Sequence, residues 1–138
     1  LLCSAGSGIA PMLSLLHDLA ARRSERDVVL LHSCRDEGDL IAAGELRDIT
    51  RQWSRLQLQL HYSSRSRHLD ADRIAELVPD WSAREALVCG PDGYADVVQS
   101  LYLRSGLGAQ LQRAGRGDGV DGLAACLVAV VRTLSSSR

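Results

Sequence analysis

Apolar runs and segments with helical periodicity alternate along the first hundred residues of the chain. The start of the chain (1–3) and the run D-V-V-L-L-H (27–32) are almost continuously apolar, which is typical of strands buried on both faces of a parallel sheet. Between them, Met12, Leu16 and Leu19 recur at the spacing of one helix face. These two segments therefore predict strands, with a helix between them.

Similar patterns extend this alternation to residue 104. The run L-Q-L-Q-L-H-Y alternates strictly and predicts a strand with one wetter face. Leu46, Ile49 and Trp53 form an apolar stripe on a second helical segment. The predicted strands are 1–3, 27–32, 56–62 and 86–89, and the predicted helices are 11–23, 42–53, 70–78 and 91–104.

Strands that alternate with helices in this way predict an α/β fold, a doubly wound, Rossmann-like parallel sheet in a single domain. Right-handed crossovers would place helices on both faces of the sheet. Ligands of such sheets bind at the carboxyl ends of the strands. Four polar or glycine-containing segments are expected at that edge: 6–8, 33–35, 63–67 and 89–93.

The pattern weakens after Gly106, where glycines become frequent and periodicity is lost. A fifth strand is only weakly indicated at 109–113, and 124–134 is compatible with a helix or a strand. We therefore expect a nucleotide-binding domain over residues 1–113, with its first strand truncated. Residues 114–138 form an atypical tail to which no structure is assigned.

Length and charge narrow the class of protein. The 138 residues suffice for one domain, and 46% apolar and 24% charged residues argue against wholesale disorder. A net charge of −1 excludes a nucleic-acid binder that works by bulk positive charge. The apolar stretch 123–131 is too short to span a bilayer, and no signal peptide is recognised at the start. We expect a cytoplasmic protein that binds neither nucleic acid nor membrane.

The four cysteines are far apart in the sequence. Cys3, Cys34, Cys89 and Cys126 show no C-x-x-C pair and no zinc-type histidine spacing. The expectation is free thiols in a reducing compartment and no metal site.

The glycine turn that follows the first apolar run suggests phosphate binding. In Gly6-Ser7-Gly8, glycine permits a close approach of the backbone to an anion, and the following helix offers unpaired N–H groups. Pro11 stands where the dinucleotide fingerprint has its third glycine. A turn that serves only packing remains the alternative at this point.

The end of the second predicted strand bears on cofactor choice. The predicted strand does not end in an acidic residue that could accept hydrogen bonds from the two ribose hydroxyls of NAD. Ser33 and Arg35 instead suit a 2′-phosphate, which favours NADP over NAD. The later corner Cys89-Gly90-Pro91 is compatible with an ordinary strand-to-helix turn, and a cysteine at a strand end is more often inert core than chemistry.

Taken in order, these motifs resemble the NAD(P)-binding domain of the ferredoxin–NADP reductase family. The matching segments are A-G-S-G-I-A-P at 5–11, H-S-C-R at 32–35 with Asp39 and Glu45-Leu46 downstream, and V-C-G-P-D-G-Y at 88–94. The resemblance covers residues 1 to about 107. It is strongest to bacterial oxidoreductases that pass electrons from NAD(P)H through flavin to an iron–sulfur partner or an oxygenase.

The resemblance implies a role for each motif. The glycine turn would line the pyrophosphate, and the arginines after the second and third strands would meet the 2′-phosphate. Cys89, Gly90 and Pro91 would lie beside the nicotinamide, with Cys89 as the candidate catalytic residue on the nicotinamide side. The implied cofactor-binding residues are Gly6, Ser7, Gly8, Pro11, Ser33, Arg35, Ser64, Arg65, Cys89, Gly90, Pro91, Gly93 and Tyr94.

The chain also departs from the family pattern. Ala10 stands where threonine is usual, and Gln112-Arg113-Ala114-Gly115 replaces the usual closing acidic and aromatic residues. The flavin domain that would hold FAD is not in this sequence. The resemblance therefore implies an NADP(H)-binding module, with NAD(H) also possible, that is inactive alone. The alternatives are a non-catalytic remnant without a ligand, a protein-interaction module, or a module that pairs with a separately encoded flavin domain.

Overall fold

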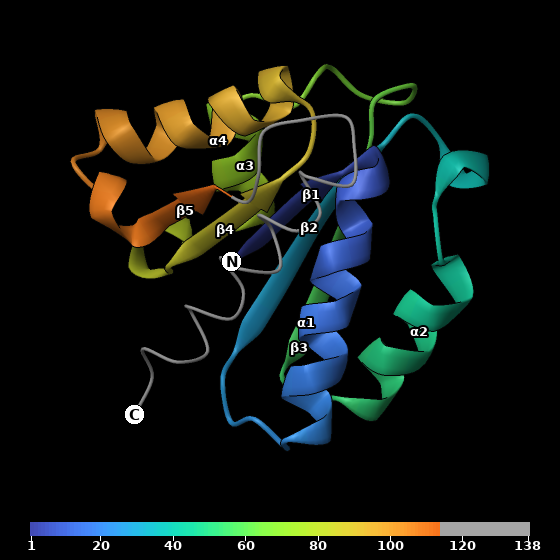
Figure 1. The fold of residues 1–138 in the computed structure, drawn as a ribbon. Helices are drawn as coiled ribbons and strands as arrows, with labels where there is room; N and C mark the ends of the chain where they lie inside the picture. The colour runs from blue at the N-terminus through green and yellow to red at the C-terminus, as the bar shows by residue number, and fades with distance from the viewer. Residues whose placement is uncertain (114–138) are drawn as a thin grey trace.

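The computed structural model describes residues 1–113, where all strands join one parallel sheet in the order β3-β2-β1-β4-β5 (Figure 1). The predictions made for 114–138, including the helix or strand at 124–134, lie outside the described residues. The strands are β1 (Leu2–Ala5), β2 (Val28–Cys34), β3 (Leu56–Tyr62), β4 (Ala86–Cys89) and β5 (Leu111–Arg113).

Helices cover both faces of this sheet, with α1 and α2 on one side and α3 and α4 on the other (Figure 1). The α-helices are α1 (Ile9–Ala21), α2 (Ala43–Gln52), α3 (Ala71–Leu77) and α4 (Asp92–Arg104). Short 3-10 helices are η1 (Gly6–Gly8), η2 (Glu37–Asp39), η3 (Trp81–Ala83) and η4 (Gly108–Gln110).

Two hydrophobic clusters, one on each face, join these layers. On the α1 and α2 face, Met12, Leu16 and Leu46 pack against Leu30. On the opposite face, Tyr102 is fully buried and its hydroxyl donates to the carbonyls of Trp81 and Arg84. Consecutive side chains of the central strands point to opposite faces and belong to different clusters. Both faces are therefore buried, which is why these strands are continuous apolar runs in the sequence.

The predicted fold class is confirmed, and the boundaries differ by a few residues. β1 continues to Ala5 and β2 to Cys34, because Ser4 and Ala5 pair in register with His32 and Ser33. The weakly indicated fifth strand is present at 111–113, paired with β4. The acidic residues that follow β2 therefore lie closer to its end than the sequence pattern indicated.

The alternating segment forms β3, an edge strand that pairs with β2 along its full length. Gln57 is exposed, whereas Leu56 and His61 are buried. His61 lies on the same face as Gln57, so the wetter face that alternation predicts is present at the start of β3 and is lost at its carboxyl end. Within residues 1–113, no helix combines the length and the apolarity needed to cross a membrane.

Candidate functional site

Two loops that are far apart in sequence meet at the carboxyl edge of the sheet. β1 pairs with β4, with Ser4 beside Cys89. A Cβ atom on Gly8 would lie 2.2 Å from the Cys89 carbonyl oxygen, and one on Gly90 would lie 3.2 Å from the Ala5 Cβ. The loop after β1 and the loop after β4 are therefore in direct contact, at the point where the strand order reverses.

The first of these loops leaves open space for a ligand. Gly6 has φ +53°, a left-handed conformation that favours glycine, and a Cβ there would have nothing within 4 Å. The helix that follows has no side-chain cap and no acidic residue in its first turn. In this first turn the Ile9 amide already donates to the Gly6 and Ser7 carbonyls and Pro11 has no N–H, so the Ala10 amide and the positive dipole end are what α1 offers to an anion such as a diphosphate.

The second loop carries Cys89, Gly90 and Pro91 into α4. The Cys89 side chain is half-buried, and Pro91 is the N-cap residue of α4. Ion pairs connect β5 to this end of the helix. The Arg113 guanidinium donates hydrogen bonds to the Asp92 carboxylate and, at 3.2 Å, to the Asp96 carboxylate. The loop of Cys89, Gly90 and Pro91 is therefore fixed on one side by contact with the loop after β1 and on the other by the ion pairs from β5 to α4.

The predicted pair Ser33 and Arg35 lies at the end of β2 in two different environments. Ser33 is buried beside Tyr94, whose hydroxyl donates to the Leu31 carbonyl at 3.4 Å. Burial raises the pKa of Tyr94 well above its usual value, so this phenol stays neutral. Arg35 is exposed, and its carbonyl accepts from the Ser64 amide at 2.9 Å.

Ser33 and Tyr94 help to line a pocket of about 380 Å³ at this edge. One wall comes from the start of α4, and the other from the loop that leads from β3 to α3. The Nε2–H of His61 donates to the Arg67 carbonyl at 3.0 Å, which leaves Nδ1 as a buried acceptor without a partner among the described residues. The lining residues are Ala5, Ser33, Cys34, His61, Ser63, His68, Leu69, Gly93, Tyr94 and Val97.

Arg65 lies at the outer end of the site, on the turn after β3. Its guanidinium stands over the Tyr62 ring, 5.3 Å from the ring centre, and lies 3.5 Å from the Glu37 carboxylate. Burial, followed by the nearby Cys34 and Glu37, raises the pKa of Tyr62, whereas Arg65 lowers it. This arginine is therefore held in place before any ligand arrives.

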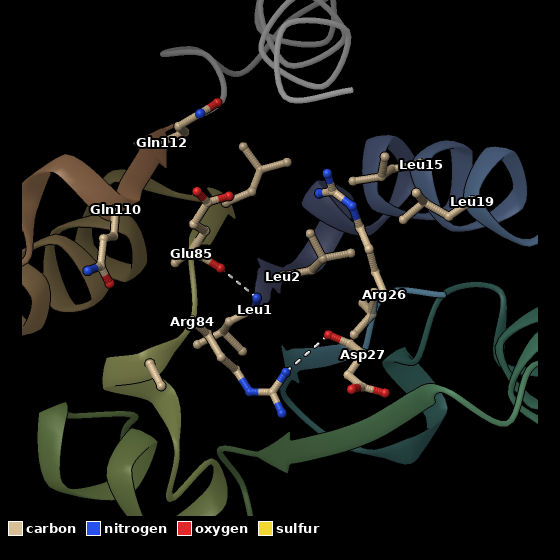
Figure 2. Close-up of a pocket in the computed structure, with 14 residues that line it drawn as sticks. Leu1, Leu2, Leu15, Leu19, Arg26, Asp27, Arg84, Glu85, Gln110 and Gln112 are labelled. Atoms are coloured by element: carbon tan, nitrogen blue, oxygen red, sulfur yellow. Dashed lines mark hydrogen bonds between the residues drawn. The ribbon is translucent and has the colours of Figure 1, made fainter. Parts of the chain in front are cut away.

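A second pocket, of about 440 Å³, opens at the other end of the sheet (Figure 2). Leu15 and Leu19 of α1 border it, and Arg84 donates to the Asp27 carbonyl at 3.1 Å across it. The Leu1 nitrogen donates to the Glu85 carbonyl at 2.6 Å. None of the predicted site residues lines this larger pocket; they lie at the carboxyl edge of the sheet.

Sequence reasoning missed several residues of the carboxyl edge. Glu37 pairs with a predicted site residue, Tyr62 stacks on the same arginine, and His61 and His68 line the pocket. His61 lies opposite Ser33 in the pairing of β2 with β3, a register that the alternation of β3 alone does not give. Among residues 1–113, no group of three or more histidine, cysteine or acidic side chains is placed to hold a metal ion.

Comparison with known proteins shows the family to which the chain belongs. The family model described as the oxidoreductase NAD-binding domain matches residues 2–100. The chain is 32% identical over 111 residues to an NADPH oxidoreductase of Mycobacterium tuberculosis, covering 80% of this chain and 29% of that protein. It is 34% identical over 108 residues to the ferredoxin reductase component of 3-ketosteroid-9-alpha-monooxygenase from Rhodococcus rhodochrous, covering 78% and 30% respectively.

A solved structure shares the fold. The flavohem-like FAD/NAD-binding domain of nitric oxide dioxygenase from Vibrio cholerae matches with a TM-score of 0.69 and 26% identity, over 81% of this chain and 48% of that one. The chain spans about 30% of the length of the two curated relatives. The motifs, the sheet order and these matches agree: the chain belongs to the oxidoreductase NAD-binding domain family, whose members here include ferredoxin reductase components.

Proposed function

We propose that this domain binds NADP(H), and NAD(H) less tightly, along the carboxyl edge of its sheet. The diphosphate lies against Gly6, Ser7 and Gly8 at the start of α1, with Pro11 in the first turn of that helix. The adenosine half extends over the ends of β2 and β3, where Arg35 and Arg65 supply positive charge with Ser33 and Ser64 nearby. The nicotinamide half extends towards Cys89, Gly90 and Pro91, with Gly93 and Tyr94 behind them.

The contact between Gly8 and the Cys89–Gly90 backbone carries this proposal. It joins the anion-binding turn and the cysteine corner into one continuous floor at the point where the strand order reverses. Open α/β sheets bind their ligands in that crevice. A floor of this kind lets one extended ligand contact both loops at once.

The residues of this chain orient the nicotinamide; the hydride chemistry is supplied by the nicotinamide and by a flavin. Cys89 and Gly90 would fix the position of the nicotinamide ring. The flavin would be held by a flavin domain, and electrons would pass on to an iron–sulfur or oxygenase partner. Residues 1–138 alone should therefore bind the dinucleotide without turning it over.

We place this activity in the cytoplasm as part of the same proposal. Cys3 and Cys34 are free thiols in the structure. Free thiols fit a reducing compartment, which is also where NADPH serves as an electron donor.

Calorimetric titration of the 138-residue chain with NADP⁺ and with NAD⁺ tests the proposal. We expect binding of NADP⁺ with a Kd below about 1 mM, which corresponds to about −4 kcal/mol. An absence of heat with both dinucleotides, on protein shown to be folded by circular dichroism, would reject it. That result would instead favour a non-catalytic remnant.

The Arg35→Ala variant tests the 2′-phosphate assignment. It should weaken NADP⁺ binding by roughly tenfold, the scale of one charge-assisted hydrogen bond, and NAD⁺ binding much less. Arg26→Ala is the matched control, since Arg26 borders the pocket at the opposite end of the sheet. Equal losses for both dinucleotides would remove Arg35 from this role.

A further inference from the structure

The turns after β2 and β3 run side by side beyond the strands themselves. The Ser63 amide donates to the Cys34 carbonyl at 3.0 Å, and the Ser64 amide donates to the Arg35 carbonyl at 2.9 Å. Residues three positions beyond the end of each strand are therefore brought to one corner of the sheet. Glu37 and Arg65 occupy those positions.

The two side chains form an ion pair in which the arginine is held more firmly than the glutamate. Arg65 is stacked on Tyr62 and lies 3.5 Å from the Glu37 carboxylate. The side chains of Arg65 and Glu37 are 64% and 72% exposed, so either can meet a ligand that arrives from solvent. An exposed pair of this kind is worth at most about 1 kcal/mol, so a stronger anion can displace the carboxylate.

Two other carboxylates near this corner cap helices. Asp36 accepts from the Gly38 amide at 2.9 Å and from the Asp39 amide at 3.3 Å, which caps η2. Asp70 caps α3 by accepting from the Arg73 amide at 2.8 Å. Glu37 is the carboxylate that the structure places on Arg65.

From this arrangement we infer that Glu37 weakens the preference of this domain for NADP(H) over NAD(H). This inference rests on the proposed function. The glutamate occupies the guanidinium that a 2′-phosphate needs, and it repels that phosphate. A 2′-hydroxyl, in contrast, can donate to the same carboxylate. Glu37 therefore penalises NADP(H) and leaves NAD(H) unharmed, so it limits the preference that Arg35 and Arg65 create.

Calorimetric titration of Glu37→Gln with NADP⁺ and NAD⁺, at low ionic strength, tests the inference. We expect NADP⁺ affinity to rise by about 3- to 10-fold, because one like charge is removed and Arg65 is released. NAD⁺ affinity should stay the same or fall. Glu25→Gln is the matched control: Glu25 is exposed before the amino end of β2, and its substitution should leave both affinities unchanged.

A double-mutant cycle with Arg65→Gln makes the test specific to the pair. If Glu37 acts by occupying Arg65, its substitution should change the NADP⁺ to NAD⁺ affinity ratio less in the Arg65→Gln background than in the natural one. An unchanged ratio in Glu37→Gln, or a loss of NADP⁺ affinity, would overturn the inference while leaving the proposed function intact. Binding of neither dinucleotide to the natural chain would overturn both.

Discussion

At the scale of single residues, two features of the sheet and its loops stand out: a glycine whose missing Cβ leaves room for another loop, and a buried pair of polar side chains. Gly8 lacks a Cβ because the Cys89 carbonyl occupies that space. Ser4 and His32 place a polar pair inside the sheet, with 2.8 Å between Oγ and Nδ1 and no exposed surface. Both features cost stability or freedom of sequence, and both lie under the candidate site.

Gly8→Ala tests the contact between the two loops. The added methyl would force the Cys89 backbone to move, and overpacking of this kind costs about 1–3 kcal/mol. We expect the free energy of unfolding, measured in urea, to fall by that amount. Gly44→Ala is the control: a Cβ there has nothing within 4 Å, and alanine in helix α2 should stabilise by up to about 1 kcal/mol. An unaffected Gly8→Ala variant would argue against the contact.

His32 should make the fold sensitive to mild acid. Burial lowers the pKa of His32 from its ordinary 6.5 to about 4, although the bond with Ser4 raises it. Between these values the unfolded chain binds a proton that the folded chain does not. Above pH 6.5, His32 therefore does not reduce the free energy of unfolding. As the pH falls from 6.5 towards 4, the free energy of unfolding decreases by about 3 kcal/mol in total because of this residue.

Urea unfolding between pH 7 and pH 4, on the natural chain and on His32→Leu, measures this effect. The natural chain should lose more stability over this range than the variant does, because leucine takes up no proton. The carboxylates titrate in both proteins and cancel in the comparison. Parallel pH profiles would show that His32 is not held neutral.

At the scale of elements, the pattern of apolar residues predicted every α-helix and the first four strands of the described part, whereas it indicated β5 only weakly and left the ends of the elements less certain. The strand at 27–32 was extended to Cys34 by pairing on both sides, with Ser4 and Ala5 of β1 and with His61 and Tyr62 of β3. A polar run such as His-Ser-Cys carries no strand signal of its own. Tertiary pairing decided this boundary, and sequence periodicity alone does not show it.

The cap of α3 gives a prediction at this scale, because this helix follows the loop that forms one wall of the pocket. Asp70 Oδ1 accepts from the Arg73 amide at 2.8 Å. Asp70→Ala should lower the free energy of unfolding by about 1 kcal/mol, and Asp70→Ser should retain most of it, since serine also caps. Equal losses in the two variants, measured by urea unfolding, would contradict a capping role.

At the scale of the whole molecule, the crossovers decide which motifs meet. Alternation of strands and helices was enough to expect the glycine turn and the Cys89 corner at one edge. It did not reveal Glu37 on Arg65, or the pocket beneath Tyr94, because both depend on where side chains point after the turns. The conformation of these loops depends on backbone hydrogen bonds between neighbouring turns. A local sequence pattern does not show such hydrogen bonds.

Amide chemical-shift mapping by NMR can locate the bound dinucleotide, which we expect along the carboxyl edge of the sheet. On titration of the ¹⁵N-labelled chain with NADP⁺, the largest shifts should fall on the amides of residues 6–10, 89, 90 and 92–94; Pro91 has no amide proton. The amides of Asp27, Glu85 and Gln110, around the pocket at the opposite end, should stay in place. Shifts centred on those three residues, with the glycine turn unaffected, would contradict the account.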